Sequence, residues 1–101
     1  MKKYTETDLV RDCLKYLRMR GVFAWRNNVG AMKTDERYVR FGAIGSSDIL
    51  GILPYGQLLC VECKVGNNKL SRSQRDWLER AKEAGAKTCV VYSLDELMAE
   101  I

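Results

Sequence analysis

The sequence predicts a mixed α/β fold in which helices cover a central sheet. Three observations support this class. An amphipathic helix pattern opens the chain, several strand-like segments follow at short intervals, and a second helix pattern stands before the last strand-like segment. A helix between strands suits a parallel crossover and short turns suit antiparallel hairpins, so we expect a mixed central sheet flanked by helices.

The bulk composition is that of an ordered protein. The chain has 101 residues, of which 47% are hydrophobic and one is proline, so we expect residues 1–101 to form a single domain. A formal net charge of +4 and a pI near 9.0 suit contact with phosphate backbones without requiring it. The sequence shows neither a signal-peptide pattern nor a membrane-length apolar run. We therefore expect a cytoplasmic protein that contacts no membrane.

Three helices are expected. The first covers residues 5–21, is capped by Thr5 or Thr7 and ends at Gly21. Its apolar positions recur at helical spacing and are Leu9, Val10, Cys13, Leu14 and Leu17. The second covers residues 74–85, follows a cap at Ser71 or Ser73, and turns Trp77, Leu78 and Ala81 inward. The third, over residues 94–101, is capped by Ser93.

Five strands are expected, and they give the element order α-β-β-β-β-α-β-α. They cover residues 22–26, 38–42, 48–53, 58–65 and 87–93. The polar, glycine-containing segment 27–37 is expected to be a loop. The turn "PYGQ" makes the third and fourth of these strands a hairpin.

The strand at residues 58–65 carries two charges within an apolar run. With a period of two, Leu58, Cys60, Glu62 and Lys64 share one face. The other face is wholly apolar and is therefore expected to be core. A charge buried in a strand costs several kcal/mol unless it is paired or serves a site. The E-x-K spacing thus places a carboxylate beside an ammonium group on the face away from the core.

Asp48 opens the partner strand and can bring a second carboxylate to this face. An even loop between the strands would oppose Asp48 to Cys63 and turn it to the wrong face. An odd loop such as "YGQ", with Gly56 at positive φ, would oppose Asp48 to Lys64. A bulge, or an Asp48 that lies before the regular pairing, would also let the groups meet.

Two carboxylates with a lysine suit phosphodiester chemistry. Carboxylate and backbone oxygens are the ligands that Mg²⁺ prefers, and a divalent ion polarises a scissile phosphate. The alternative is an ordinary ion pair of Glu62 with Lys64 on a wet sheet surface, with Asp48 only ending a turn. The C-x-x-C of Cys60 and Cys63 is not expected to bind zinc, because strand positions i and i+3 face opposite ways and the chain has no histidine.

Three motifs together resemble one nuclease family. They are G-x-x-D at Gly45–Asp48, E-x-K at Glu62–Lys64, and S-x-x-Q at Ser71–Gln74, which opens a helix ending in Gly85. This set resembles the stand-alone VRR-NUC domains of viruses and phages, within the PD-(D/E)XK nuclease superfamily, over nearly the whole chain. Ser47 stands where the superfamily name has proline.

The resemblance implies a restriction-endonuclease-like α-β-β-β-α-β core and an endodeoxyribonuclease dependent on Mg²⁺ or Mn²⁺. It makes Asp48, Glu62 and the backbone carbonyl of Cys63 metal ligands and Lys64 the catalytic lysine. It also places Gln74 near that lysine and gives Glu6 a metal contact through water. For Glu6 the alternative is a favourable charge at a helix start, and for Gln74 an ordinary first-turn position.

Basic residues elsewhere suit contacts with DNA. Trp25 and Tyr38 stand near some of them and suit stacking. Solvated surface charge is the alternative for each cation singly. The candidates are Arg26, Lys33, Arg37, Arg40, Lys69, Arg72 and Arg75.

One site on each chain means that cutting two strands needs two chains. Stand-alone members of the family look like homodimers that resolve four-way (Holliday) junctions, so we expect branched DNA as partner and no nucleotide cofactor. For a phage-encoded chain the location would be the host cytoplasm. The alternatives are a flap or nicking nuclease acting on single-stranded or forked DNA, and a non-catalytic DNA-binding module. The intact Asp48, Glu62 and Lys64 argue against the last of these.

Overall fold

The computed structural model describes residues 2–101 and confirms the predicted mixed α/β class. A short 3₁₀ turn at Pro54–Gly56 joins the fourth and fifth strands. In chain order the elements are α1 (Glu6–Met19), β1 (Phe23–Arg26), β2 (Gly30–Lys33), β3 (Tyr38–Phe41), β4 (Ile49–Ile52), β5 (Leu58–Cys63), α2 (Arg72–Glu83), β6 (Lys87–Val91) and α3 (Leu94–Glu100).

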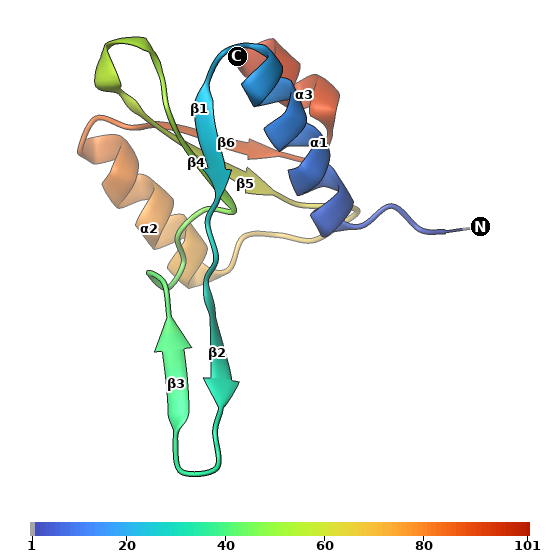
Figure 1. Cartoon of the computed structure of the whole chain (residues 1–101). Helices are drawn as coiled ribbons and strands as arrows, with labels where there is room; N and C mark the ends of the chain where they lie inside the picture. Colours follow the sequence, from blue (N-terminus) through green and yellow to red (C-terminus); the bar gives the residue numbers. More distant parts are fainter. Residues whose placement is uncertain (1) are drawn as a thin grey trace.

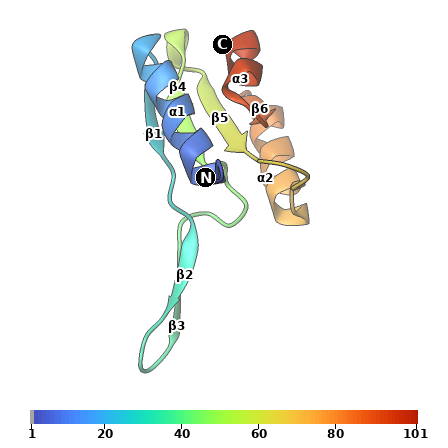
Figure 2. The same ribbon diagram turned by 90° about the vertical axis from the view of Figure 1, so that its right-hand side faces the viewer.

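The central sheet has four strands in the order β1-β4-β5-β6 (Figure 1). Strand β4 pairs antiparallel with both β1 and β5, whereas β5 and β6 are parallel. The helix α2 provides the crossover between the two parallel strands, as the sequence predicted. Helices α1 and α3 lie together on one side of the sheet, and α2 lies on the other side (Figure 2).

The main core fills the space between the sheet and the pair α1 and α3. All five apolar positions predicted for the first helix are buried there. The apolar face of β5 meets them, since Leu59, Val61 and Cys63 are each 0% exposed. Burying one such aliphatic side chain contributes about 1.5–3 kcal/mol, so this strand anchors the fold. The predicted apolar core face of β5 is confirmed, but the opposite face, expected to lie away from the core, is buried too: Cys60, Glu62 and Lys64 are 0%, 1% and 8% exposed.

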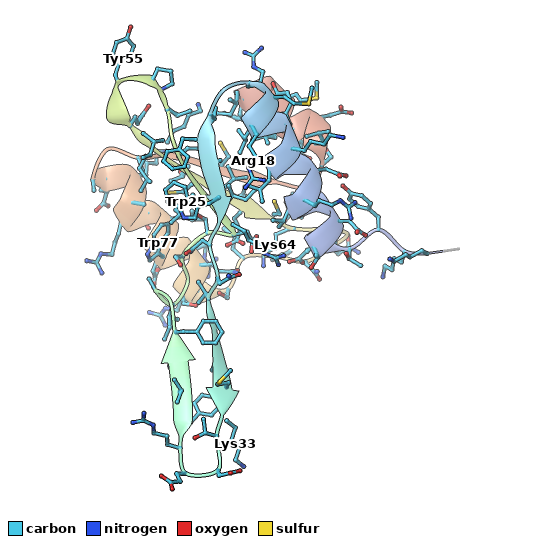
Figure 3. The ribbon with its side chains drawn as sticks, viewed as in Figure 1. Arg18, Trp25, Lys33, Tyr55, Lys64 and Trp77 are labelled. Atoms are coloured by element: carbon cyan, nitrogen blue, oxygen red, sulfur yellow. The ribbon has the colours of Figure 1, made fainter. Side chains whose placement is uncertain are left out.

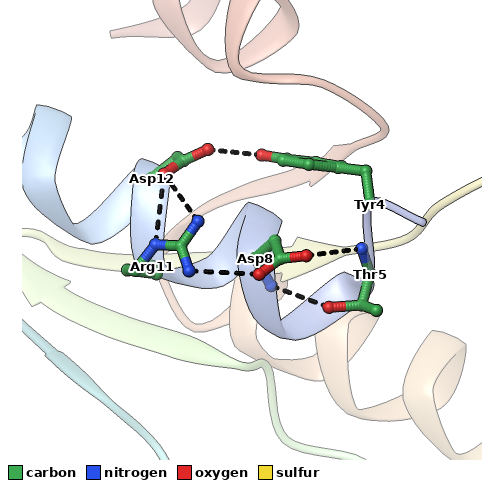
Figure 4. A network of polar contacts seen from close by, with 5 residues as sticks. All are labelled: Tyr4, Thr5, Asp8, Arg11 and Asp12. Carbon is green, nitrogen blue, oxygen red and sulfur yellow. Dashed lines mark hydrogen bonds and ion pairs between the residues drawn. The ribbon is translucent and has the colours of Figure 1, made fainter. Parts of the chain in front are cut away.

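A network of polar contacts fixes the start of α1 (Figure 4). Thr5 is the N-cap, and it forms a reciprocal capping box with Asp8. The Tyr4 hydroxyl donates a hydrogen bond of 2.6 Å to Asp12 one turn further along. These contacts hold the first turn in place and thereby position Glu6, the first residue of the helix.

The caps of the other helices are also resolved. Ser71 caps α2 and Ser93 caps α3. On α2, Leu78 is buried, while Trp77 and Ala81 are half-buried. Within residues 2–101 no helix has the length and apolarity that crossing a membrane would require.

The expectation of a loop over residues 27–37 was wrong. Residues Gly30–Lys33 form β2, which pairs antiparallel with β3. The two strands make a ribbon of their own that projects away from the central sheet (Figure 1). They pair only with each other and cover no core, so the sequence shows no alternation of buried and exposed positions there. The element order is therefore α-β-β-β-β-β-α-β-α.

The turn between β4 and β5 has an odd number of residues, which is one of the three arrangements expected to bring Asp48 to the candidate site. Leu53 N–H donates to the carbonyl of Gln57 at 2.8 Å, and the residues between them form the turn. Tyr55 and Gly56 both have positive φ, of 70° and 84°. The turn thus consists of Pro54–Gly56 and begins one residue earlier than the expected "YGQ". As a result the pairing of β4 with β5 is shifted by two residues, and Asp48 stands opposite Glu62 instead of Lys64.

Gly45 generates a stability prediction because it combines positive φ with close packing. Its φ is +83°, and a Cβ there would lie 2.3 Å from the carbonyl oxygen of Ser73 at the start of α2. Gly66 is a matched control, with φ +59° and nothing within 4 Å of its Cβ position. We expect Gly66→Ala to cost about 1 kcal/mol from backbone strain alone. Gly45→Ala should cost at least about 1–2 kcal/mol more, because α2 must shift.

Urea unfolding of the two variants beside the parent protein measures both costs. Equal losses would show that the contact of Gly45 with Ser73 adds nothing beyond backbone strain.

Candidate active site

The two candidate carboxylates meet at one end of the β4–β5 pair. Ile49 pairs with Val61, so Asp48 just before it stands opposite Glu62 just after it. Directly opposed residues share a face, and Asp48 therefore lies beside Glu62 rather than opposite Lys64. The backbone N–H of Cys63 donates to Asp48 Oδ2 at 2.8 Å and fixes this carboxylate against β5. Asp48 precedes the regular strand, which was one of the expected alternatives.

Polar contacts behind Asp48 hold its backbone in place. Asn27 N–H donates to the Asp48 carbonyl at 2.8 Å and extends the β1–β4 ladder by one residue. The Asn27 amide also donates to Ser46 Oγ at 2.7 Å and to the Ser47 carbonyl at 2.9 Å. Both serines are buried. The sequence pattern gave no role to Asn27 or Ser46, because one asparagine after a strand carries no specific signal.

Glu62 is the most unusual carboxyl group of the described residues. It is only 1% exposed, and its Oε2 is buried without a hydrogen-bond partner among residues 2–101. Burial raises the pKa of Glu62 to about 9, and the neighbouring Asp48 and Glu6 carboxylates raise it too, while Lys64 lowers it. A buried acceptor without a partner is costly unless something else supplies the partner. Glu62 therefore has the character of a ligand rather than of a surface charge.

Lys64 lies two residues beyond Glu62, near the end of β5 (Figure 3). It is 8% exposed. The backbone N–H of Lys64 donates to the Val91 carbonyl at 3.0 Å, which continues the pairing of β5 with β6. Within residues 2–101 no carboxylate lies within 4.0 Å of its ammonium group. The alternative of an ordinary surface ion pair with Glu62 is therefore not what the structure shows.

The donor set fits a hard divalent cation. An ion would supply the partner that Glu62 Oε2 lacks and would offset the repulsion between the Glu62 and Asp48 carboxylates. Residues 2–101 contain no group of three or more His, Cys, Asp or Glu side chains arranged to hold an ion. Two carboxylates would thus be completed by a backbone carbonyl, such as that of Cys63, and by water or phosphate oxygens. Mg²⁺ commonly binds proteins in this way.

Glu6 lies on the α1 side of this group. Its Oε2 accepts a hydrogen bond of 2.8 Å from the Asn68 amide, and the Tyr92 hydroxyl donates to the Asn68 carbonyl at 2.7 Å. Asn68, in the segment between β5 and α2, therefore ties α1 to the end of β6. The sequence pattern did not indicate Asn68. The charge of Glu6 also raises the pKa of Glu62, as the weakest of the influences on that group.

Gln74 lines the same cleft as Asp48, a cleft whose lining does not include Glu62, Lys64 or Glu6. Its Oε1 accepts from the Ser71 N–H at 2.9 Å in the capping box of α2. This explains the S-x-x-Q motif as a helix start, but it does not remove Gln74 from the site. A polar cleft of about 270 Å³ is lined by Gln74, Asp48 and Arg26, among others. A larger concavity of about 770 Å³ lies along α2 beside Trp77, and it contains none of the candidate catalytic residues.

The predicted DNA-binding cations are all exposed, but they do not form one patch. Only Arg26 lines the cleft that contains Asp48. Arg72 lies 3.9 Å from Asp76, and Arg75 borders a separate groove beside β6. Lys69 lies in the segment before α2, whereas the ribbon carries Lys33, Arg37 and Arg40.

The burial of Glu62 generates a stability prediction for the metal-free protein. Because its folded pKa is about 9 against an ordinary 4.5, folding takes up a proton between these values. The stability of the parent protein should therefore fall as pH rises from 5 to 9, by at most about 1.4 kcal/mol per pH unit. Glu62→Gln should lack this slope, because its amide does not ionise.

Urea unfolding in a chelator at several pH values compares the two proteins. Adding Mn²⁺ or Mg²⁺ at pH 8 should then stabilise the parent protein and not Glu62→Gln. Parallel pH profiles for the two would mean that Glu62 is not held protonated by its surroundings.

Comparison with known proteins places this geometry in a family. The model of the VRR-NUC domain matches residues 3–95. A solved structure described as a VRR_NUC domain is similar, with a TM-score of 0.64 and 26% sequence identity, and the match covers 94% of this chain and 96% of that one. The search of curated proteins gave no match. Such a domain implies a nuclease of the restriction-endonuclease-like type, with DNA as substrate and a general use of divalent metals. The chain belongs to the VRR-NUC domain family.

Proposed function

We propose that residues 1–101 act as one nuclease domain, a Mg²⁺- or Mn²⁺-dependent DNA endonuclease with Asp48, Glu62 and Lys64 at its centre. One observation carries the proposal. A buried Glu62 oxygen without a hydrogen-bond partner stands beside Asp48, and a buried lysine lies two residues further on the same face. A structural carboxylate would not be expected in this environment.

The reaction is hydrolysis of a phosphodiester. A water oxygen bonds to phosphorus, one P–O ester bond breaks, and the leaving oxygen takes up a proton while the attacking water loses one. A bound divalent cation would polarise the phosphate and stabilise the charge that develops on its oxygens. Asp48 and Glu62 would hold the cation, with Asp48 oriented by the Cys63 N–H. Lys64 would orient or deprotonate the attacking water, or offset charge on the phosphoryl oxygens.

The cleft beside Asp48 is suited to the DNA backbone. The first turn of α2 borders it through Ser71, Ser73 and Gln74. A helix N-terminus presents free N–H groups and a positive dipole end to an anion. Arg26, which also lines the cleft, adds a full positive charge. A phosphate that enters this cleft would lie beside Asp48.

The proposal extends to a homodimer that resolves four-way junctions. Support comes from apolar side chains on the face of the sheet that α2 leaves uncovered. Phe23 is 70% exposed and pairs with Ile52, which is 41% exposed and pairs in turn with Leu58. Ile44, at 54% exposed, lies in the segment before β4. A surface of this kind suits a second copy, and two-fold symmetry would present two equivalent sites to two equivalent strands.

The catalytic assignment predicts a sharp loss of activity. Lys64→Ala and Asp48→Asn should each reduce the single-turnover cleavage rate at saturating Mg²⁺ by at least about 100-fold. Lys82→Ala is the matched control, because Lys82 is exposed at the far end of α2 and should cut at the parental rate. Near-parental cleavage by either site variant would show that the reaction takes place elsewhere.

The substrate assignment predicts paired cuts on a mobile four-way junction. The protein should introduce symmetric nicks in opposing strands and leave matched flaps and linear duplexes largely uncut. Equal cutting of flaps would favour the nicking alternative. Stable binding without cleavage in Mg²⁺ and in Mn²⁺ would favour a DNA-binding module. Sedimentation of the protein alone should show a dimer, and a monomer at the concentration used for cleavage would contradict that part of the proposal.

A further inference from the structure

The β2–β3 ribbon is the largest feature of the fold that catalysis as proposed does not use. It extends from the body beside the candidate cleft and points away from α1 and α2 (Figures 1 and 2). The chain enters and leaves the ribbon through residues that line that cleft. Asn28 and Val29 lead into β2, and Gly45 and Ser46 follow β3. Anything that lies in the cleft therefore lies at the foot of the ribbon.

The register gives the ribbon two different faces. Lys33 pairs with Tyr38 and Ala31 pairs with Arg40, so these four residues share one face. The Arg40 guanidinium lies 6.0 Å from the centroid of the Tyr38 ring. We call this the basic face. The opposite face carries Gly30, Met32, Val39 and Phe41.

The basic face has the chemistry of a phosphate contact. It presents Lys33 and Arg40 without an ion-pair partner among residues 2–101, and both are exposed. The tip of the ribbon carries a net negative charge, because its turn holds Asp35 and Glu36 beside a single cation, Arg37. An acidic tip is unsuited to entering a DNA groove, so a contact along the side of the ribbon is favoured.

We propose that the basic face of the β2–β3 ribbon lies along the backbone of the duplex arm on one side of the cut. This inference rests on the proposed function, which places the cleaved phosphate at the foot of the ribbon. From Asn27 to Asp35 an extended chain reaches at most roughly 26 Å. At 3.4 Å per base pair, the ribbon accompanies the duplex for about 8 base pairs. The ribbon thus sets how much duplex the enzyme requires beside its cleavage site.

Binding in a chelator, where no cleavage occurs, tests this directly. The probe is a fluorescent four-way junction with arms of 20 base pairs, titrated with full-length protein between 50 and 200 mM KCl. The double variant Lys33→Ala/Arg40→Ala should weaken the salt dependence: the negative slope of log affinity against log salt should become less steep by about 2 for each ribbon that contacts DNA. The matched control is Arg80→Ala/Lys82→Ala, which removes the same two residue types from the exposed last turn of α2. The control should keep the parental slope.

A second measurement varies the length of the DNA arms. Shortening the arms from 20 to 6 base pairs should weaken binding of the parent protein at least 5-fold and leave the ribbon variant nearly unchanged. A parental salt slope, or the same dependence on arm length in variant and parent, would overturn the inference. A ribbon variant that changes the dimer equilibrium in sedimentation, but not the salt slope, would also overturn it and would assign the ribbon to a second copy of the chain.

The proposed function fails separately from this inference. If the protein binds with the expected slopes but never cleaves, the ribbon contact stands and the nuclease assignment fails. If it cleaves at the parental rate while Lys33→Ala/Arg40→Ala keeps the parental slope, the ribbon inference alone fails.

Discussion

The buried carboxyl group of Glu62 is the constraint on which the rest of the structure depends. It lies in β5, the strand with the most completely buried side, and that apolar side anchors the sheet to α1 and α3. The same backbone therefore fixes both the core and the candidate site. The charged groups around Glu62 come from three parts of the chain: Asp48 stands just before β4, Glu6 begins α1, and Lys64 directly follows β5 itself. The register of β4 and β5 brings Asp48 to Glu62, strand alternation puts Lys64 on the same face, and only Glu6 depends on how a helix packs.

Much of this could be predicted from the sequence because the period-two pattern is a local property. Alternation over residues 58–65 assigned Glu62 and Lys64 to one face and the core residues to the other. The register could not be predicted with the same certainty. The turn can begin at more than one residue of the segment Pro54–Gly56. At a position with positive φ, glycine is favoured because it has no Cβ to clash. The structure instead places Tyr55, a bulky residue, at φ 70° beside Gly56. No local pattern indicates that choice, which depends on how β4 and β5 pack.

The ribbon shows a second limit of sequence reasoning. Strand patterns arise because one face of a sheet is buried, and β2 and β3 bury neither face against the body. The Phe41 ring lies over Gly30, and a Cβ at this position would lie 2.7 Å from that ring. A glycine in a polar segment suggests a loop, although here it permits a cross-strand contact. Asn27 and Asn68 were missed for a related reason, since their importance lies in partners distant in the chain.

The turn at Pro54–Gly56 stands at the opposite end of the β4–β5 hairpin from Asp48 and Glu62. Tyr55 at its tip is fully exposed, so the turn projects into solvent (Figure 3). The chain can therefore be opened or extended there without passing near the carboxylates. The turn is therefore a suitable place to attach a fluorophore that reports the movement of the nuclease on DNA. It is equally suited to hold the new termini of a circularly permuted protein, and in both cases the reaction centre stays intact.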